Sequence, residues 1–80
     1  MATTPLPKFT WVDLGSNPIS IQSTTNTPLW VDMSPTTPDN SIKGKNVVDD
    51  NGLITCYPEA GERIFAMAPF DDADITTRPA

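Results

Sequence analysis

The chain has 80 residues, with ten acidic and five basic side chains, no histidine and a formal net charge of −5. A chain of this length forms at most one small domain, because it buries only roughly 60% of its unfolded surface. Without histidine the chain cannot build a Ser-His or Cys-His nucleophile pair, and its single cysteine cannot close a disulfide or a Cys/His zinc site.

The charge balance also bears on partners. Nucleic-acid-binding proteins neutralise phosphates with clustered basic residues, whereas the five basic residues here are scattered and only Lys43 and Lys45 are close together. No apolar run approaches the ~20 residues of a membrane-spanning helix, and the first residues do not resemble a signal peptide. We therefore expect no direct nucleic-acid binding, no membrane association and synthesis in a cytoplasm.

The predicted elements begin with an extended arm over residues 1–8, which contain two prolines and show no periodicity. A β domain over residues 9–70 follows, and it opens with the β-forming run Phe9–Leu14. Ile19–Ser23 and Leu29–Met33 both alternate apolar and polar residues, as half-buried strands do. The polar turn between these two strands predicts a hairpin.

A second hairpin is expected after an exposed loop at Ser34–Asn40. Ile42–Val48 is a weaker strand candidate, and Leu53–Tyr57 is the expected return strand. Between them, Asn51 and Gly52 favour a type I′ turn, since both residue types tolerate positive φ.

The last predicted turn is Pro58–Gly61, where Gly61 supplies the left-handed conformation. Glu62–Ala68 forms the last strand, and residues 71–80 are expected to run on as an acidic C-terminal tail. Five to six strands with even turn spacing and no helical periodicity predict an all-β fold, a small antiparallel β-sandwich or barrel.

This sheet pattern yields more large apolar residues than one small core can hold. The alternation predicts an inner face of Ile19, Ile21, Leu29, Val31, Met33, Val47, Leu53, Ile64 and Ala66. Trp11, Trp30, Phe65 and Met67 have opposite or uncertain parity. Large apolar residues left outside a core usually mark an interface, and the alternative is that one tryptophan packs under the Pro35–Asn40 loop.

The polar residues do not form a recognisable catalytic or metal site. Asp49–Ile54 resembles the middle of a calcium loop, but Val47 and Pro58 occupy the positions of its strongest ligands. Glu59 and Glu62 lie at a turn, where a solvent-facing role is more common than acid–base catalysis. We expect no metal, no cofactor and no enzymatic activity.

Two further features have simple interpretations. Cys56 has no histidine or cysteine partner and is read as a small apolar core residue. Asp71, Asp72 and Asp74 are read as a solvated acidic cluster, with a metal shared between chains as the alternative.

The segment Pro18–Met33 with the Thr/Pro-rich Ser34–Asn40 resembles the opening of small all-β structural proteins of tailed-bacteriophage virions. Tyr57–Phe65 is similar to the closing turn and strand of that type. The resemblance implies a virion structural protein made in the host cytoplasm, most simply a capsid decoration or cement subunit that binds the major capsid protein or other virion proteins. It also implies a homo-oligomer, as a trimer or ring, and it carries over no catalytic residues.

We predict that the interface lies on the arm and on the surplus apolar residues. The predicted interface residues are Pro5, Leu6, Pro7, Phe9, Trp11, Trp30, Met67 and Phe70. Alternatives are a neck, tail or baseplate component, a carbohydrate- or receptor-binding module that stacks sugars on Trp11, Trp30 and Tyr57, and an acidic inhibitor of a host enzyme.

Overall fold

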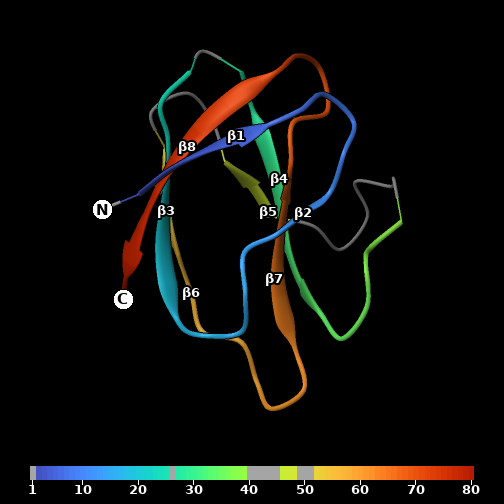
Figure 1. Ribbon diagram of the computed structural model, residues 1–80, viewed down its shortest axis with the longest axis vertical. Coiled ribbons are helices and arrows are strands. Elements are labelled where there is room, and N and C mark those ends of the chain that lie inside the picture. The colour runs from blue at the N-terminus through green and yellow to red at the C-terminus, as the bar shows by residue number, and fades with distance from the viewer. Residues whose placement is uncertain (1, 26, 40–45, 49–51) are drawn as a thin grey trace.

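The computed structural model of the chain describes residues 2–25, 27–39, 46–48 and 52–80. The described residues form eight strands in two four-stranded antiparallel sheets (Figure 1). The strand order is β1-β8-β3-β6 in the first sheet and β2-β7-β4-β5 in the second. The strands are β1 (Ala2–Leu6), β2 (Val12–Asp13), β3 (Ile19–Ser23), β4 (Leu29–Ser34), β5 (Asn46–Val48), β6 (Leu53–Cys56), β7 (Arg63–Met67) and β8 (Ala73–Pro79).

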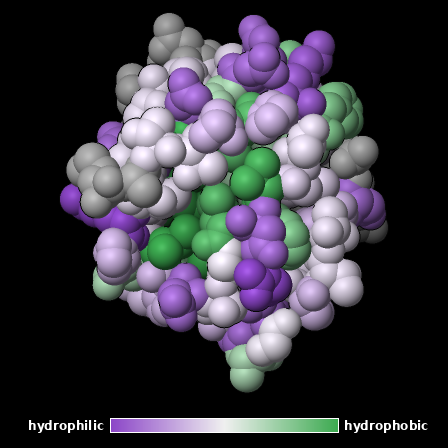
Figure 2. All heavy atoms as spheres, in the orientation of Figure 1, coloured by the Kyte–Doolittle hydropathy of each residue, from purple (hydrophilic) through white to green (hydrophobic). Residues whose placement is uncertain are grey.

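The all-β class is confirmed, and the two sheets share one apolar core, as expected for a sandwich. Side chains from both sheets form that core: Leu6, Ile21, Leu29, Val31, Val48, Cys56, Ile64, Ala66, Ala68, Ala73 and Ile75. Figure 2 shows apolar surface in the middle of one face, surrounded by more polar side chains. In the described ranges no helix has the length and hydropathy to cross a membrane.

The strand pairing differs from both predicted hairpins. β3 pairs with β6 and β8, while β4 pairs with β5 and β7, so the two strands of the first predicted hairpin lie in different sheets. β5 and β6 are separated in the same way. Apolar alternation predicts a strand and its inner face but not its neighbours. Here the inner faces of the two strands of each predicted hairpin oppose each other across the core. Residue 51, of the predicted type I′ turn, lies outside the described residues.

Both ends of the chain form strands that the sequence does not predict. The described residues therefore contain eight strands rather than the predicted five to six. Residues 2–6 are not a free arm, because β1 pairs with β8 from Ala2 opposite Thr77 to Leu6 opposite Ala73. Pro5 is compatible with this strand because β1 is an edge, where alternate residues direct their backbone away from the sheet.

The predicted acidic tail over residues 71–80 contains β8, which lies between β1 and β3. Ala73 and Ile75 are buried while Asp74 between them is exposed, which is the period of two expected of a strand. Composition alone does not reveal this alternation, because the three aspartates of residues 71–80 make the segment resemble an acidic tail.

The predicted inner face is right at most positions and wrong at two. Val47 is 48% exposed and Leu53 57% exposed, whereas Val48 and Cys56 are buried. A strand carries alternate residues on opposite faces, so choosing the wrong member of a neighbouring pair reverses the assignment of the whole strand. The predicted burial of Cys56 is confirmed, and so is the left-handed Gly61 at the turn before β7, with φ of 86°.

The central position of β8 predicts that Ile75 is essential to the fold. Ile75→Ala is expected to lower the free energy of unfolding by about 2–5 kcal/mol, because it leaves a cavity at a fully buried site. Chemical denaturation followed by tryptophan fluorescence measures this change.

The matched control is Asp74→Ala on the exposed face of the same strand, with an expected change within about 0.5 kcal/mol. Equal, small effects for the two variants would show that the segment behaves as a tail after all.

Candidate interaction surface

Two backbone connections meet at one corner of the molecule, the one between β1 and β2 and the one between β7 and β8 (Figure 1). The Phe9 N–H donates to the Ala68 carbonyl at 2.8 Å, and the Lys8 N–H donates to Asp72 Oδ1 at 2.7 Å. In the sequence, Phe70 lies between the acceptor residues Ala68 and Asp72. The two hydrogen bonds therefore bring Phe9 and Phe70 to the same corner. We call Phe9 and Phe70 the aromatic corner.

Both rings of the aromatic corner face solvent, Phe9 with 53% and Phe70 with 64% of its surface exposed. Phe9 also has a φ of 61°, and it alone among the described non-glycine residues has a positive φ. The left-handed conformation costs an L-residue roughly 1–2 kcal/mol. The fold therefore tolerates strain at a side chain that does not contribute to its core.

The surroundings of the corner combine proline and carboxylate groups. Pro5 and Pro7 are exposed, and they flank a shallow depression whose other side is Asp72–Asp74. Asp71 is exposed as well, so among the described residues the carboxylates Asp71, Asp72 and Asp74 outnumber the cation Lys8 at this corner. A partner that covers the corner is therefore expected to offer apolar surface with basic groups around it.

The two tryptophans lie elsewhere, on the outer face of the second sheet. Trp30 is opposite Met67 on one side and Val47 on the other, and continuing the β2–β7 register places Trp11 opposite Met67 as well. The Trp11 Nε1–H donates to the carbonyl of Asp39 at 3.2 Å, in the loop that follows β4. Both tryptophans are half-buried, so Trp11 matches the alternative in which a tryptophan packs under that loop.

Two predicted interface residues have little surface to offer. Leu6 is 1% exposed and belongs to the shared core, and Met67 is fully buried on the outer face beside Trp30. Their apolar character is explained by packing within the chain. The predicted interface therefore reduces to its exposed members, of which Phe9 and Phe70 are the largest.

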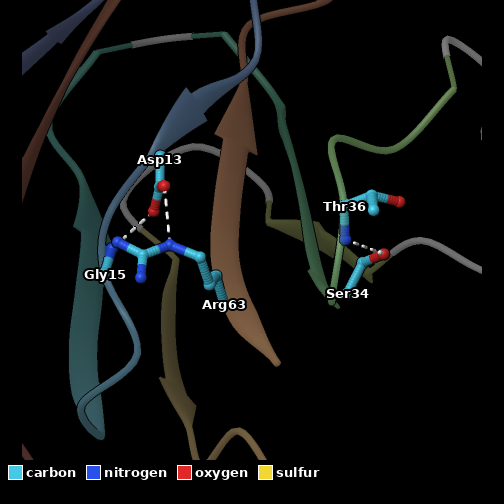
Figure 3. A network of polar contacts seen from close by, with 5 residues as sticks. All are labelled: Asp13, Gly15, Ser34, Thr36 and Arg63. Carbon is cyan, nitrogen blue, oxygen red and sulfur yellow. Dashed lines mark hydrogen bonds and ion pairs between the residues drawn. The ribbon is translucent and has the colours of Figure 1, made fainter. Parts of the chain in front are cut away.

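An ion pair secures β2, the shortest strand. The Arg63 Nε–H donates to Asp13 Oδ2 at 2.7 Å, and the Gly15 N–H donates to Asp13 Oδ1 at 2.8 Å (Figure 3). Leu14 and Gly15 both bond to Ile64, so two residues oppose one, as in a β-bulge. Gly15 has a positive φ (96°), which glycine adopts without steric penalty. The hydrogen bonds from Arg63 and Gly15 hold the pKa of the Asp13 carboxyl below its ordinary value.

A second polar contact in the same view, from the Thr36 N–H to Ser34 Oγ at 3.3 Å, orders the start of the loop after β4 (Figure 3). Within the described ranges, no three His, Cys, Asp or Glu side chains are grouped as a metal site. Burial raises the pKa of the Cys56 thiol, which keeps it in the protonated form.

Sequence reasoning missed two exposed apolar residues, Val47 and Leu53, which belong to the edge strands β5 and β6. Tyr57, which the sequence offers for sugar stacking, is exposed directly after β6. Assigning the opposite parity to these two strands would have placed Val47 and Leu53 on the exposed face.

No known protein family, curated protein or solved structure matches the chain.

The Asp13–Arg63 pair predicts a pH-dependent contribution to stability. Because the folded pKa of Asp13 lies below the unfolded value of about 3.9, the contact stabilises the fold above that value and is lost as the pH falls through the folded pKa. Asp13→Asn is expected to lower the urea midpoint more at about pH 7 than at about pH 2, because the carboxylate is progressively protonated as the pH falls toward and through its lowered folded pKa.

The effect is small because both side chains are about half exposed. Asp74→Asn makes the same change of charge outside this ion pair and serves as the control. A midpoint difference between Asp13→Asn and the parent that is the same at both pH values would contradict the assignment.

Proposed function

We propose that the protein is a non-enzymatic structural subunit that binds a larger assembly through the aromatic corner. The observation that carries the proposal is the pair of exposed rings, Phe9 and Phe70, held at one corner by backbone hydrogen bonds. The resemblance of Pro18–Asn40 to small virion proteins identifies the assembly in this proposal as a tailed-phage particle, with the protein as a capsid decoration subunit. A neck, tail or baseplate subunit is a variant of the same proposal.

The energetics of the corner favour a partner. Covering one phenylalanine side chain contributes about 1.5–3 kcal/mol, and binding hot spots are compact aromatic clusters surrounded by polar groups. Phe9 and Phe70 with their acidic surroundings have that composition. Because the backbone bonds fix Phe9 before binding, little conformational entropy is lost when a partner covers it.

The acidic surroundings also support a protein partner with basic groups, such as a coat subunit. A subunit that binds only the assembled coat stabilises it by mass action, in proportion to the logarithm of its free concentration. An acidic inhibitor of a host enzyme would use the same surface chemistry, and it differs in that it binds one soluble protein and is absent from particles.

Replacing both rings is expected to abolish binding to particles. In co-sedimentation with capsids assembled without the protein, the Phe9→Ser/Phe70→Ser variant should remain in the supernatant while its circular dichroism stays that of the parent. Val47→Ser, an exposed apolar residue on β5 outside the corner, is the matched control and should sediment with capsids. Sedimentation of the double variant at the level of the parent would overturn the proposal.

The strain at Phe9 gives a further expectation for the same site. Phe9→Gly should leave the free energy of unfolding unchanged or raise it by up to about 1 kcal/mol, because glycine adopts positive φ without the penalty. Chemical denaturation measures the stability and co-sedimentation the binding. A gain or no change in stability together with weaker binding is the signature of a residue kept for a partner. A clear loss of stability would assign Phe9 to the fold.

A further inference from the structure

The free edges of the two sheets differ in how they are protected against pairing with another chain. Natural edge strands carry prolines or charges or are very short, because an unprotected edge pairs with other strands. β1 contains Pro5, and β2 has two residues and the Asp13–Arg63 ion pair, while only Asn46–Val48 of β5 belongs to the described residues. β6 has none of these features: the run from Leu53 to Tyr57 contains neither a charge nor a proline.

The backbone of β6 presents hydrogen-bonding groups to the free side. The Ser23 N–H donates to the Gly52 carbonyl at 3.1 Å, which marks Ser23 and Gly52 as a hydrogen-bonded pair. Such pairs alternate along an antiparallel ladder, so Ile54 and Cys56 direct their N–H and C=O groups to β3. Leu53, Thr55 and Tyr57 direct theirs away from β3, where no described strand pairs with β6.

The side chains of β6 are also suited to a neutral contact. Leu53 is 57% and Tyr57 is 66% exposed, and both lie on the outer face with Thr55, while Ile54 and Cys56 face inward. A second copy of this chain carries the same net charge of −5, so self-association is favoured only where charges are absent. β6 offers such a stretch, whereas the aromatic corner is surrounded by carboxylates.

We propose that two copies of the protein associate through β6, paired antiparallel around a two-fold axis at Thr55. In that register Thr55 lies opposite Thr55 of the second copy, and Leu53 lies opposite Tyr57 of the second copy, twice per dimer. These are the three residues whose backbone groups point outward, so the pairing forms about six hydrogen bonds between the copies. Outer-face side chains of one copy meet outer-face side chains of the other. The β1-β8-β3-β6 sheets of the two copies then form one continuous sheet.

A two-fold contact of this kind is closed, because the same strand serves both copies. The trimer or ring predicted from the sequence needs a different contact, in which one edge pairs with another edge of the next copy. The proline of β1 and the short length and ion pair of β2 oppose that arrangement. The inference does not depend on the aromatic corner and goes beyond the proposed function.

Sedimentation equilibrium of the full chain tests the association. A single-strand interface is small and therefore weak, so the expected result is a concentration-dependent monomer–dimer equilibrium below about 1 mM. Leu53→Lys should raise the dissociation constant about tenfold or more, since the charge enters the contact twice per dimer. Phe70→Lys, the same change at a more exposed apolar residue, is the control and should leave the constant unchanged.

A protein that stays monomeric up to about 1 mM, or that forms a trimer or ring, overturns the inference. So does a Leu53→Lys variant that dimerises like its parent.

Disulfide trapping tests the register. In a Cys56→Ala background, Thr55→Cys places two thiols on opposed residues with Cα atoms about 5.5 Å apart, within disulfide range. Leu53→Cys places them about four residues out of register, roughly 13 Å apart, which is too far for a disulfide. Under mild oxidation the Thr55→Cys variant should form covalent dimers and the Leu53→Cys variant should not. Equal trapping of both, or of neither, contradicts the register.

Discussion

The pairing of β8 with both β1 and β3 is the interaction on which the rest of the structure depends. It brings the first and last strands of the chain into one sheet and buries Leu6 opposite Ala73, at the end of the β1–β8 pairing. Thr24 reinforces it, since both its N–H and its hydroxyl donate to the Asp74 carbonyl. The aromatic corner follows from the same pairing, because Phe9 comes three residues after β1 and Phe70 three residues before β8.

A second constraint is the small number of large apolar residues available to an 80-residue chain. The shared core uses mainly aliphatic residues and alanine, and none of the phenylalanines or tryptophans belongs to it. Phe65 and Met67 are instead buried on the outer face of the second sheet, where Met67 lies opposite Trp30 and Phe65 opposite Asp32. The domain therefore has apolar packing on both sides of its second sheet, which compensates for the limited burial that a small chain achieves.

The sequence predicts the content of this fold better than its connections. Alternation correctly places Ile21, Val31 and Ile64 inside, because a period of two is a local property. Strand partners are non-local, and nothing in the composition of residues 71–80 distinguishes a central strand from a tail except the spacing of Ala73 and Ile75. The adjacent Val47 and Val48 leave parity undecided from the sequence, since either can face inward.

The candidate site shows the same division. Phe9 and Phe70 can be selected from the sequence as large apolar residues outside the alternation, but their proximity depends on hydrogen bonds between segments 59 or more residues apart. Leu6 and Met67 satisfy the same sequence criterion and are buried, because each faces a layer that the pattern does not reveal. The strain at Phe9 is visible only in the structure.

The two proposed contacts, at the aromatic corner and at the β6 edge, use different surfaces and can therefore form together. A dimer closed at β6 carries two aromatic corners, and a particle coat repeats its binding sites at fixed spacing. If one dimer spans two such sites, the second contact forms at a high effective concentration, so two weak corners give tight attachment without a larger interface. A small acidic domain with few apolar residues gains more from this arrangement than from enlarging either surface, because each added exposed apolar group would also increase its tendency to aggregate in the free state.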